Sequence, residues 1–393
     1  MEPSVTIKSD IFKGRLPGLD GVRGLAILLV MAYHFVARIA HTRPMSDEAL
    51  SIVDHLAVKI TDAGWVGVEI FFVLSGFLIT GILYQSRLER GYFRVFYARR
   101  TLRIAPLYYS FLILGFLATP YLMGSKTSAF AIPSNKHWWF WCYLTNWLFA
   151  YEGTFNLTNG GYLWSLAVEE QFYLIWPFIV LAFSARTLMY FCITLFFLTG
   201  LLRVYLITVG VSTTAVYTMS ISHADGLILG SCLVMAVQEF GAVRLRPLML
   251  SLFASSFLGA IAVIYFNNWN FRFYDENVAA FGYSCVAVLS ACLIWAVLPD
   301  SGMDCIRCRF EGAFLRSFGK FSYAIYLIHI PIAVFIMKGV FDPGIHKIAN
   351  EYLPSIILYC LSCIAICWMV ALGSWHLFEK QILKLKSYFP YHE

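Results

Sequence analysis

Long apolar stretches recur along the chain and are separated by short polar or charged segments. Each stretch is about 17 to 25 residues long, which lets a helix cross a hydrocarbon core about 30 Å thick. The pattern predicts ten membrane-spanning helices in one membrane domain that fills residues 1–393. The predicted spans lie near residues 19–40, 63–84, 104–123, 162–184, 187–209, 223–240, 248–266, 278–298, 318–338 and 354–378.

An aromatic stretch between the third and fourth spans, His137–Tyr151, is too short to cross a membrane comfortably. It contains Trp138, Trp139, Trp141 and Trp147. Tryptophan is enriched at the boundary between lipid and water. We therefore expect this stretch to be a short re-entrant or interfacial segment.

Composition supports a membrane protein over a water-soluble one. Hydrophobic residues make up 60% of the chain and charged residues 13%, and the mean hydropathy is +0.70. With an odd-even alternation of ten spans, most Lys and Arg residues fall on one side, which predicts that both termini are cytosolic. We expect an all-α polytopic membrane protein.

The net charge of +6 therefore reflects membrane topology, and no basic cluster has a nucleic-acid-binding pattern. The cysteines are scattered, and the pair Cys305 and Cys308 has no second ligand pair nearby in the sequence. We predict no metal site, no disulfide framework and no nucleic-acid partner.

Ionisable side chains inside predicted spans are costly, so they are candidates for function. Arg23 and His34 are eleven residues apart, which places them on one stripe of the first helix, about 16 Å apart along its axis. One ligand could contact both. The alternatives are that Arg23 anchors the cytosolic boundary beside Asp20 and that His34 is a packing residue.

The span 162–184 carries Ser165, Glu169 and Tyr173 at i,i+4 spacing, which places a carboxylate between two hydroxyl groups. Glu169 is the stronger candidate than its neighbour Glu170, although the two acids could also form a structural hydrogen-bonded pair.

Other polar groups within the spans are supporting candidates. Ser322, Tyr326 and His329 form a polar stripe in the span 318–338, which packing and a hydrogen bond between helices would also explain. Counting residues from the span ends places Glu69 and Arg203 at a membrane depth similar to those of His34 and Glu169.

The predicted cytosolic loop 85–103 is rich in arginine and ends at Arg100 and Arg103, next to the third span. Guanidinium groups bind phosphate in a bidentate manner, so the loop favours a cofactor with several phosphates. Positive-inside sorting and attraction to the headgroups of membrane lipids would also account for the cluster.

Taken together, these motifs resemble the acyltransferase-3 family of membrane O-acyltransferases, typified by O-antigen and nodulation-factor acetylases. The resemblance spans nearly the whole chain. It rests on an Arg followed by ten residues and a His, and on six motifs in order: LDGVRGLA (19–26), FFVLSGFLI (71–79), RRTLRIAP (99–106), LWSLAVEEQFY (163–173), DGLILG (225–230) and SYAIYLIH (322–329).

The resemblance implies an enzyme that transfers an acyl group, usually acetyl, from cytosolic acyl-CoA to a hydroxyl of a carbohydrate or glycolipid. It implies cofactor-binding roles for Arg23, Arg100 and Arg103, and catalytic roles for His34 and Glu169. The sequence departs from the family at residues 223–225, where His-Ala-Asp replaces the expected Arg-x-Asp, which leaves the role of Asp225 in doubt.

Many relatives also carry a soluble hydrolase-like C-terminal domain. This chain ends fifteen residues after its last predicted span, so we expect it to act alone, with a separate partner or as a homodimer.

The expected mechanism uses His34 as the general base that accepts the proton of the acceptor hydroxyl. Glu169 would orient His34, and Arg203 would stabilise the developing oxyanion. The alternative is a transporter or flippase for a lipid-linked or sugar substrate, because such proteins also bury charged residues in the membrane.

Overall fold

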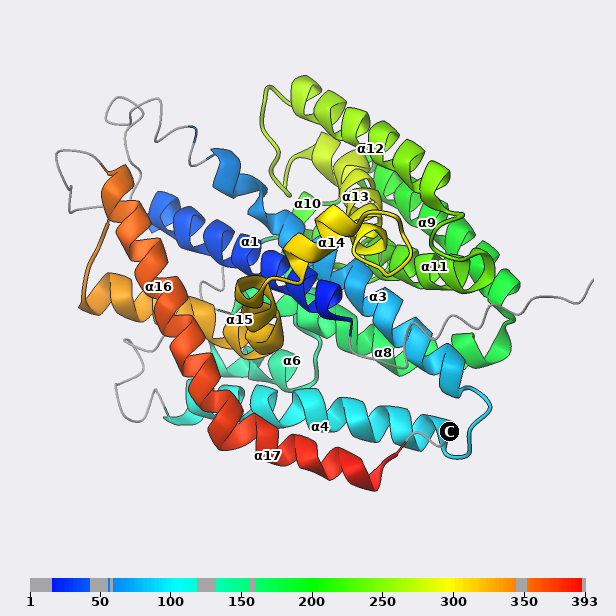
Figure 1. Ribbon diagram of the computed structural model, residues 1–393. Coiled ribbons are helices and arrows are strands. Elements are labelled where there is room, and N and C mark those ends of the chain that lie inside the picture. The colour runs from blue at the N-terminus through cyan, green and yellow to red at the C-terminus, as the bar shows by residue number, and fades with distance from the viewer. Residues whose placement is uncertain are drawn as a thin grey trace, which may run out of the picture.

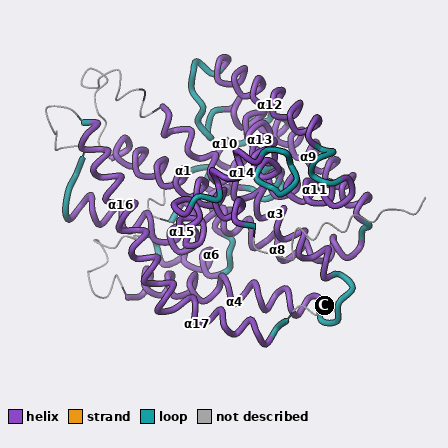
Figure 2. Tube along the Cα trace, in the orientation of Figure 1, coloured by secondary structure: helices purple, strands orange, loops and turns teal. Residues whose placement is uncertain are grey.

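The computed structural model describes residues 16–42, 56, 59–118, 132–155, 160–343 and 352–390, and regular structure in these ranges is helical (Figure 2). Nine helices in this part of the chain are long and apolar enough to cross a membrane, which confirms the all-α polytopic prediction. They contain α1 (Pro17–Thr42), α3 (Val66–Ser86), α4 (Tyr92–Ile113), α8 (Trp164–Ala182), α9 (Ala185–Thr208), α12 (Arg246–Phe266), α13 (Tyr283–Ala296), α15 (Ala313–Gly339) and α16 (Leu353–Ser374).

The predicted span 223–240 forms the shorter helix α11 (Asp225–Phe240). Its 16 residues reach about 24 Å, less than the thickness of a typical hydrocarbon core. It packs against α3, α9 and α13, in the interior of the helix bundle (Figure 1). Its apolar residues are therefore covered mainly by protein. A prediction based on the length of apolar runs, which assumes surrounding lipid, therefore overestimated the length of this helix.

The aromatic stretch forms two short helices, α6 (His137–Trp141) and α7 (Thr145–Glu152). Neither is long enough to cross a membrane, in agreement with the expected non-crossing segment. The remaining helices, also short, are α10 (Thr213–Thr218), α14 (Asp304–Phe310) and α17 (Lys380–Leu383).

The third long helix begins well before its predicted start at residue 104. Helix α4 starts at Tyr92, directly after Gly91, whose φ of 81° ends the preceding turn. The expected cytosolic loop therefore becomes helical from Tyr92 onward, and Arg100 and Arg103 lie on a helix. A prediction from apolar length ends a span where charged residues begin. Here the charged side chains of Arg100 and Arg103 have protein neighbours, so the helix extends past them.

The two outer helices α9 and α12 expose large apolar side chains, as expected for surfaces that face lipid. On α12 these side chains are Leu248, Leu250, Leu252, Phe253, Phe257, Leu258, Ile261, Tyr265 and Phe266. Helices α1, α3, α11, α13 and α15 lie further inside the bundle (Figure 1). Polar residues on these inner helices are thus shielded from lipid.

Helices α1 and α15 pack along much of their length, and small residues let their backbones approach closely. A Cβ atom on Gly319 of α15 would overlap the carbonyl oxygen of Asp20 on α1. Further along the same pair, His34 contacts His329, so the two helices run in the same direction. This packing determines which residues of α1 and α15 face each other.

The close packing predicts a large effect of Gly319→Ala. The added methyl group must push the two backbones apart, and overpacking of this kind costs about 1–3 kcal/mol. We expect thermal unfolding of the detergent-solubilised protein at a clearly lower temperature. Gly373→Ala on α16 is the matched control, because nothing lies within 4 Å of the added Cβ there. Equal unfolding temperatures for the two variants would contradict the prediction.

Candidate functional site

A cavity of about 100 Å³ lies between α1, α3, α4, α8 and α15. Arg23 from α1 and Arg100 and Arg103 from α4 line it, so the structure brings together all three arginines expected to bind a cofactor. The other lining residues are Val68, Phe71, Phe72, Ser75, Ile104, Ser165, Leu166, Glu169, Tyr173, Ser322, Tyr323 and Tyr326. We call this space the arginine cavity.

Glu169 is the carboxylate of the arginine cavity. Its Oε1 accepts a hydrogen bond from Ser75 Oγ at 2.8 Å, and its Oε2 accepts one from Tyr173 OH at 2.9 Å. The hydrogen bond to Tyr173 follows from the i,i+4 spacing seen in the sequence. Ser75 was not singled out there, because its position opposite Glu169 depends on how α3 packs against α8.

The charge of the arginine cavity is positive overall. Three guanidinium groups line it together with one carboxylate, that of Glu169. Arg100 lies over the ring of Tyr173, with 4.1 Å from its Cζ to the ring centre, and Arg100 Nε is buried without a hydrogen-bond partner among the described residues. Arg23 Nη1 lies 3.4 Å from Asp20 Oδ1. Such a site favours an anion.

The C-terminal segment brings a further basic residue, Lys386, near these arginines. Arg99 on α4 donates a hydrogen bond of 2.8 Å to the carbonyl of Phe389. Lys386 lies close enough to Arg103 for the two positive charges to repel each other. Helix α17 and the turn Lys384–Tyr388 run alongside α4 (Figure 1). The sequence pattern did not indicate Lys386, because the approach of this residue to α4 depends on how the chain folds back after α16.

A hydroxyl cluster lies at the α8–α15 side of the cavity. Ser165 Oγ and Tyr326 OH are 2.6 Å apart, and Tyr326 OH also donates to the carbonyl of Tyr162. Tyr162 OH in turn donates to the carbonyl of Leu327 at 2.6 Å. These bonds fix the side chain of Tyr326 between the cavity and the histidine that follows it by one helical turn.

His34 and His329 form a pair in the protein interior. The distance between His34 Nδ1 and His329 Nε2 is 3.0 Å, and His329 Nδ1 lies 2.7 Å from the carbonyl oxygen of Tyr326. His34 does not line the arginine cavity. Tyr326 is the link, because its side chain lines the cavity and its carbonyl contacts His329.

Four charged or titratable residues form a separate cluster that has no exposed surface: Glu69, Arg203, His223 and Asp225. Arg203 Nη1 lies 2.9 Å from Asp225 Oδ2, and His223 contacts Glu69. Trp164 and Tyr283 stack on the imidazole of His223. Estimates of membrane depth grouped Glu69 and Arg203 with His34 and Glu169. In the structure, Glu69 and Arg203 instead belong to this separate cluster.

The buried cluster bears on two predictions. Ligand atoms of Glu69, His223 and Asp225 lie within 4.8 Å of one another, which is a spacing that a metal ion could use. However, Arg203 already forms an ion pair with Asp225, and His223 already contacts Glu69. Because Arg203 is paired here and does not line the arginine cavity, the structure offers no geometry for its expected oxyanion role.

Glu170 points differently from Glu169. It does not line the cavity, and its Oε1 is buried without a hydrogen-bond partner among the described residues. Glu169 thus lines the arginine cavity and Glu170 does not, and the preference for Glu169 as the site residue stays a prediction.

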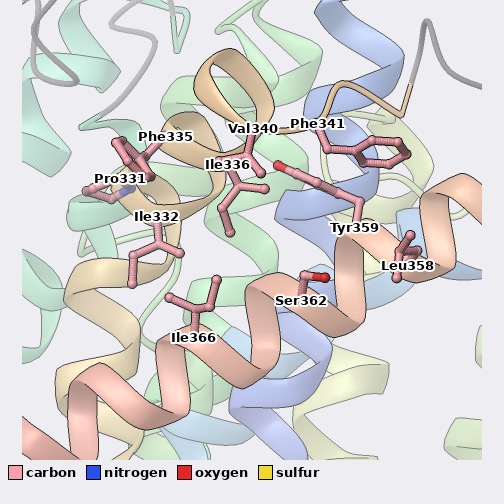
Figure 3. Close-up of a pocket in the computed structure, with 10 residues that line it drawn as sticks. All are labelled: Pro331, Ile332, Phe335, Ile336, Val340, Phe341, Leu358, Tyr359, Ser362 and Ile366. Atoms are coloured by element: carbon pink, nitrogen blue, oxygen red, sulfur yellow. The ribbon is translucent and has the colours of Figure 1, made fainter.

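A second cavity of about 570 Å³ lies between α15 and α16 (Figure 3). Pro331, Ile332, Phe335 and Ile336 of α15 face Tyr359 and other residues of α16 across it. None of its described lining residues carries a charge, so this apolar groove lacks the groups that would bind phosphate.

Comparisons with known proteins bear on the chemistry of the site. A family model described as an acyltransferase domain matches residues 16–372. "Peptidoglycan O-acetyltransferase OatA" of Listeria monocytogenes is 30% identical over 337 residues, which cover 81% of this chain and 49% of that protein. "Putative peptidoglycan O-acetyltransferase YrhL" of Bacillus subtilis is 29% identical over 389 residues, which cover 93% of this chain and 55% of that protein. The chain therefore spans about half the length of these relatives, and no solved structure matches it.

Proposed function

The chain belongs to the acyltransferase-3 family, and on that premise we propose that it is a membrane O-acetyltransferase that uses acyl-CoA to esterify a carbohydrate hydroxyl. Two relatives are named as peptidoglycan O-acetyltransferases, one of them as putative, which makes a cell-wall polysaccharide the first acceptor to test. The proposal assigns the protein to a bacterial inner membrane, with acyl-CoA approaching from the cytosol.

The arginine cavity is the proposed donor site. The phosphate groups of acyl-CoA would bind Arg100 and Arg103 first, because both lie on α4, the helix that also carries Arg94 and Arg99. Arg23 would bind further along the same passage. Guanidinium groups suit this task because they bind phosphate oxygens through two parallel hydrogen bonds.

In the proposed reaction, the acceptor hydroxyl oxygen attacks the thioester carbonyl carbon. A new C–O ester bond forms, the C–S bond breaks, and the CoA thiolate leaves. His34 accepts the hydroxyl proton and then passes it to the thiolate, so the histidine is regenerated after each turnover. Glu169 balances the charge of the arginines beside the thioester. Because Glu169 lines the arginine cavity and His34 does not, the expected orienting role of Glu169 stays a prediction.

One observation carries this proposal: Tyr326 connects the arginine cavity to the histidine pair. A cavity of about 100 Å³ is smaller than the several hundred Å³ typical of ligand sites. Donor binding therefore requires the cavity to widen, and rotation of Tyr326 away from Ser165 would open it toward His34.

The test is a direct assay of the full-length protein in lipid nanodiscs. Acetyl-CoA is supplied with and without peptidoglycan fragments, free CoA thiol is measured, and the fragments are weighed by mass spectrometry. We expect thiol release that depends on the acceptor and a matching gain of one acetyl mass. Thiol release at the same low rate with and without the fragments, and no acetylated product, would reject the proposal. A transporter would move a substrate between compartments without releasing thiol.

The arginines give a separate prediction. Replacing Arg100 and Arg103 by Gln removes two charge-assisted hydrogen bonds, each worth about 1.5–3 kcal/mol, so KM for acetyl-CoA should rise by at least about tenfold. Arg94→Gln is the matched control, because Arg94 is an exposed arginine on the same helix. If the double variant binds acetyl-CoA as the control does, these arginines serve membrane topology alone.

A further inference from the structure

We propose that His329 is a positioning residue that holds His34 in the tautomer required of a general base. This inference rests on the proposed function, since it concerns the same proton transfer. It assigns a chemical task to a residue that the sequence placed only among supporting candidates. Hydrogen bonds link the backbone of Tyr326 through His329 to His34.

The contact between His329 and the backbone of Tyr326 determines the tautomer of His329. Its Nδ1 lies 2.7 Å from the carbonyl oxygen of Tyr326. A carbonyl oxygen can only accept a hydrogen bond, so Nδ1 of His329 must carry the proton. In the neutral imidazole, Nε2 of His329 is then an acceptor.

The tautomer of His329 in turn determines the tautomer of His34. Nε2 of His329 lies 3.0 Å from Nδ1 of His34, and since His329 Nε2 accepts, His34 Nδ1 must donate. The proton of neutral His34 therefore resides on Nδ1, and its Nε2 is the basic nitrogen. A backbone carbonyl thus determines, through two rings, which nitrogen of His34 takes up a proton.

Packing makes the histidine pair rigid. His329 has no exposed surface, and the rings of Tyr162 and Phe35 lie 5.0 and 6.3 Å from it. The close packing of α1 against α15 fixes the separation of the two histidines. When His34 becomes protonated, its Nδ1–H bond to His329 remains, so the charged intermediate keeps an acceptor that needs no rearrangement.

Three variants of His329 separate positioning from mere packing. Gln places an amide oxygen near the position of Nε2, where it can accept from His34. Asn can still donate to the Tyr326 carbonyl but is too short to reach His34, and Leu removes both bonds. We expect kcat to fall about 100-fold in His329→Leu and His329→Asn, and to stay within about tenfold of wild type in His329→Gln.

A spectroscopic readout makes the test independent of turnover. In protein labelled with ¹⁵N-histidine, the wild-type His34 signals should report a protonated Nδ1 and an unprotonated Nε2, with assignment from the His34→Ala spectrum. This pattern should persist in His329→Gln and be lost in His329→Asn. A wild-type His34 protonated on Nε2 would overturn the inference.

The outcomes also distinguish this inference from the proposed function. If His34→Ala retains wild-type kcat, the general-base proposal fails regardless of His329. If His34→Ala is inactive while His329→Leu is fully active, the base stands and the positioning role is rejected. If Gln proves as damaging as Leu in correctly folded protein, His329 contributes shape rather than an acceptor, which also rejects it.

Discussion

His34→Ala is expected to lower kcat for acetyl transfer by about 10²- to 10⁴-fold, the usual contribution of a positioned general base. The imidazole lies beside His329 rather than in the arginine cavity, so the variant keeps the arginines that we propose to bind phosphate. KM for acetyl-CoA should therefore stay within about twofold of wild type. The measurement is steady-state thiol release with saturating peptidoglycan fragments.

The exposed His376 provides the control for this experiment. His376→Ala removes an imidazole from the same protein without touching the proposed site, and it should leave kcat unchanged. Wild-type turnover in His34→Ala would remove the base from the mechanism. An increase in KM with an unchanged kcat would instead assign His34 to substrate binding.

Arg203→Met is expected to destabilise the protein by about 3–5 kcal/mol, the typical result of removing one partner of a buried ion pair. The change leaves Asp225 without its cationic partner in a region with no exposed surface, where the hydroxyl of Ser284 donates a hydrogen bond to its carboxylate. The double variant Arg203→Met, Asp225→Leu should recover most of the loss, since neither charge remains. Thermal unfolding of the purified protein in detergent would measure the difference.

An exposed ion pair offers the comparison. Arg186 has 73% of its side chain exposed and pairs with Glu239, so Arg186→Met should cost no more than about 1 kcal/mol. If Arg203→Met unfolds at the same temperature as Arg186→Met, the cluster of Glu69, Arg203, His223 and Asp225 is not a structural unit. If the double variant is less stable than Arg203→Met, Asp225 stabilises the fold through another partner.

Nine of the ten predicted spans correspond, in order, to the long apolar helices in the described part of the chain, because lipid and protein interior both demand long apolar runs. The prediction failed where protein rather than lipid surrounds a helix. Charged side chains on α4 face a polar cavity, so the helix continues back to Tyr92 through arginines that a window would place in a loop. Helix α11 is shortened for a related reason, since neighbouring helices cover it.

Within the site, local spacing predicted what one helix can determine. Ser165, Glu169 and Tyr173 share one face of α8, and Tyr173 does bond Glu169. Contacts between helices could not be predicted in this way. The bond between His34 and His329 joins residues 295 positions apart and depends on how α1 and α15 pack. Membrane depth alone misassigned Arg203, because depth does not specify position within the membrane plane.

The bond between Ser165 and Tyr326 has a consequence for bioenergetics. A polar path that ran uninterrupted from cytosol to exterior would conduct protons and dissipate the electrochemical gradient of the cell. In the proposed reaction, the phenol of Tyr326, which also donates to the Tyr162 carbonyl, would separate the arginine cavity from the histidines between turnovers. An enzyme that took its donor from the cytosol under this proposal could thereby work in an energised membrane without acting as a leak.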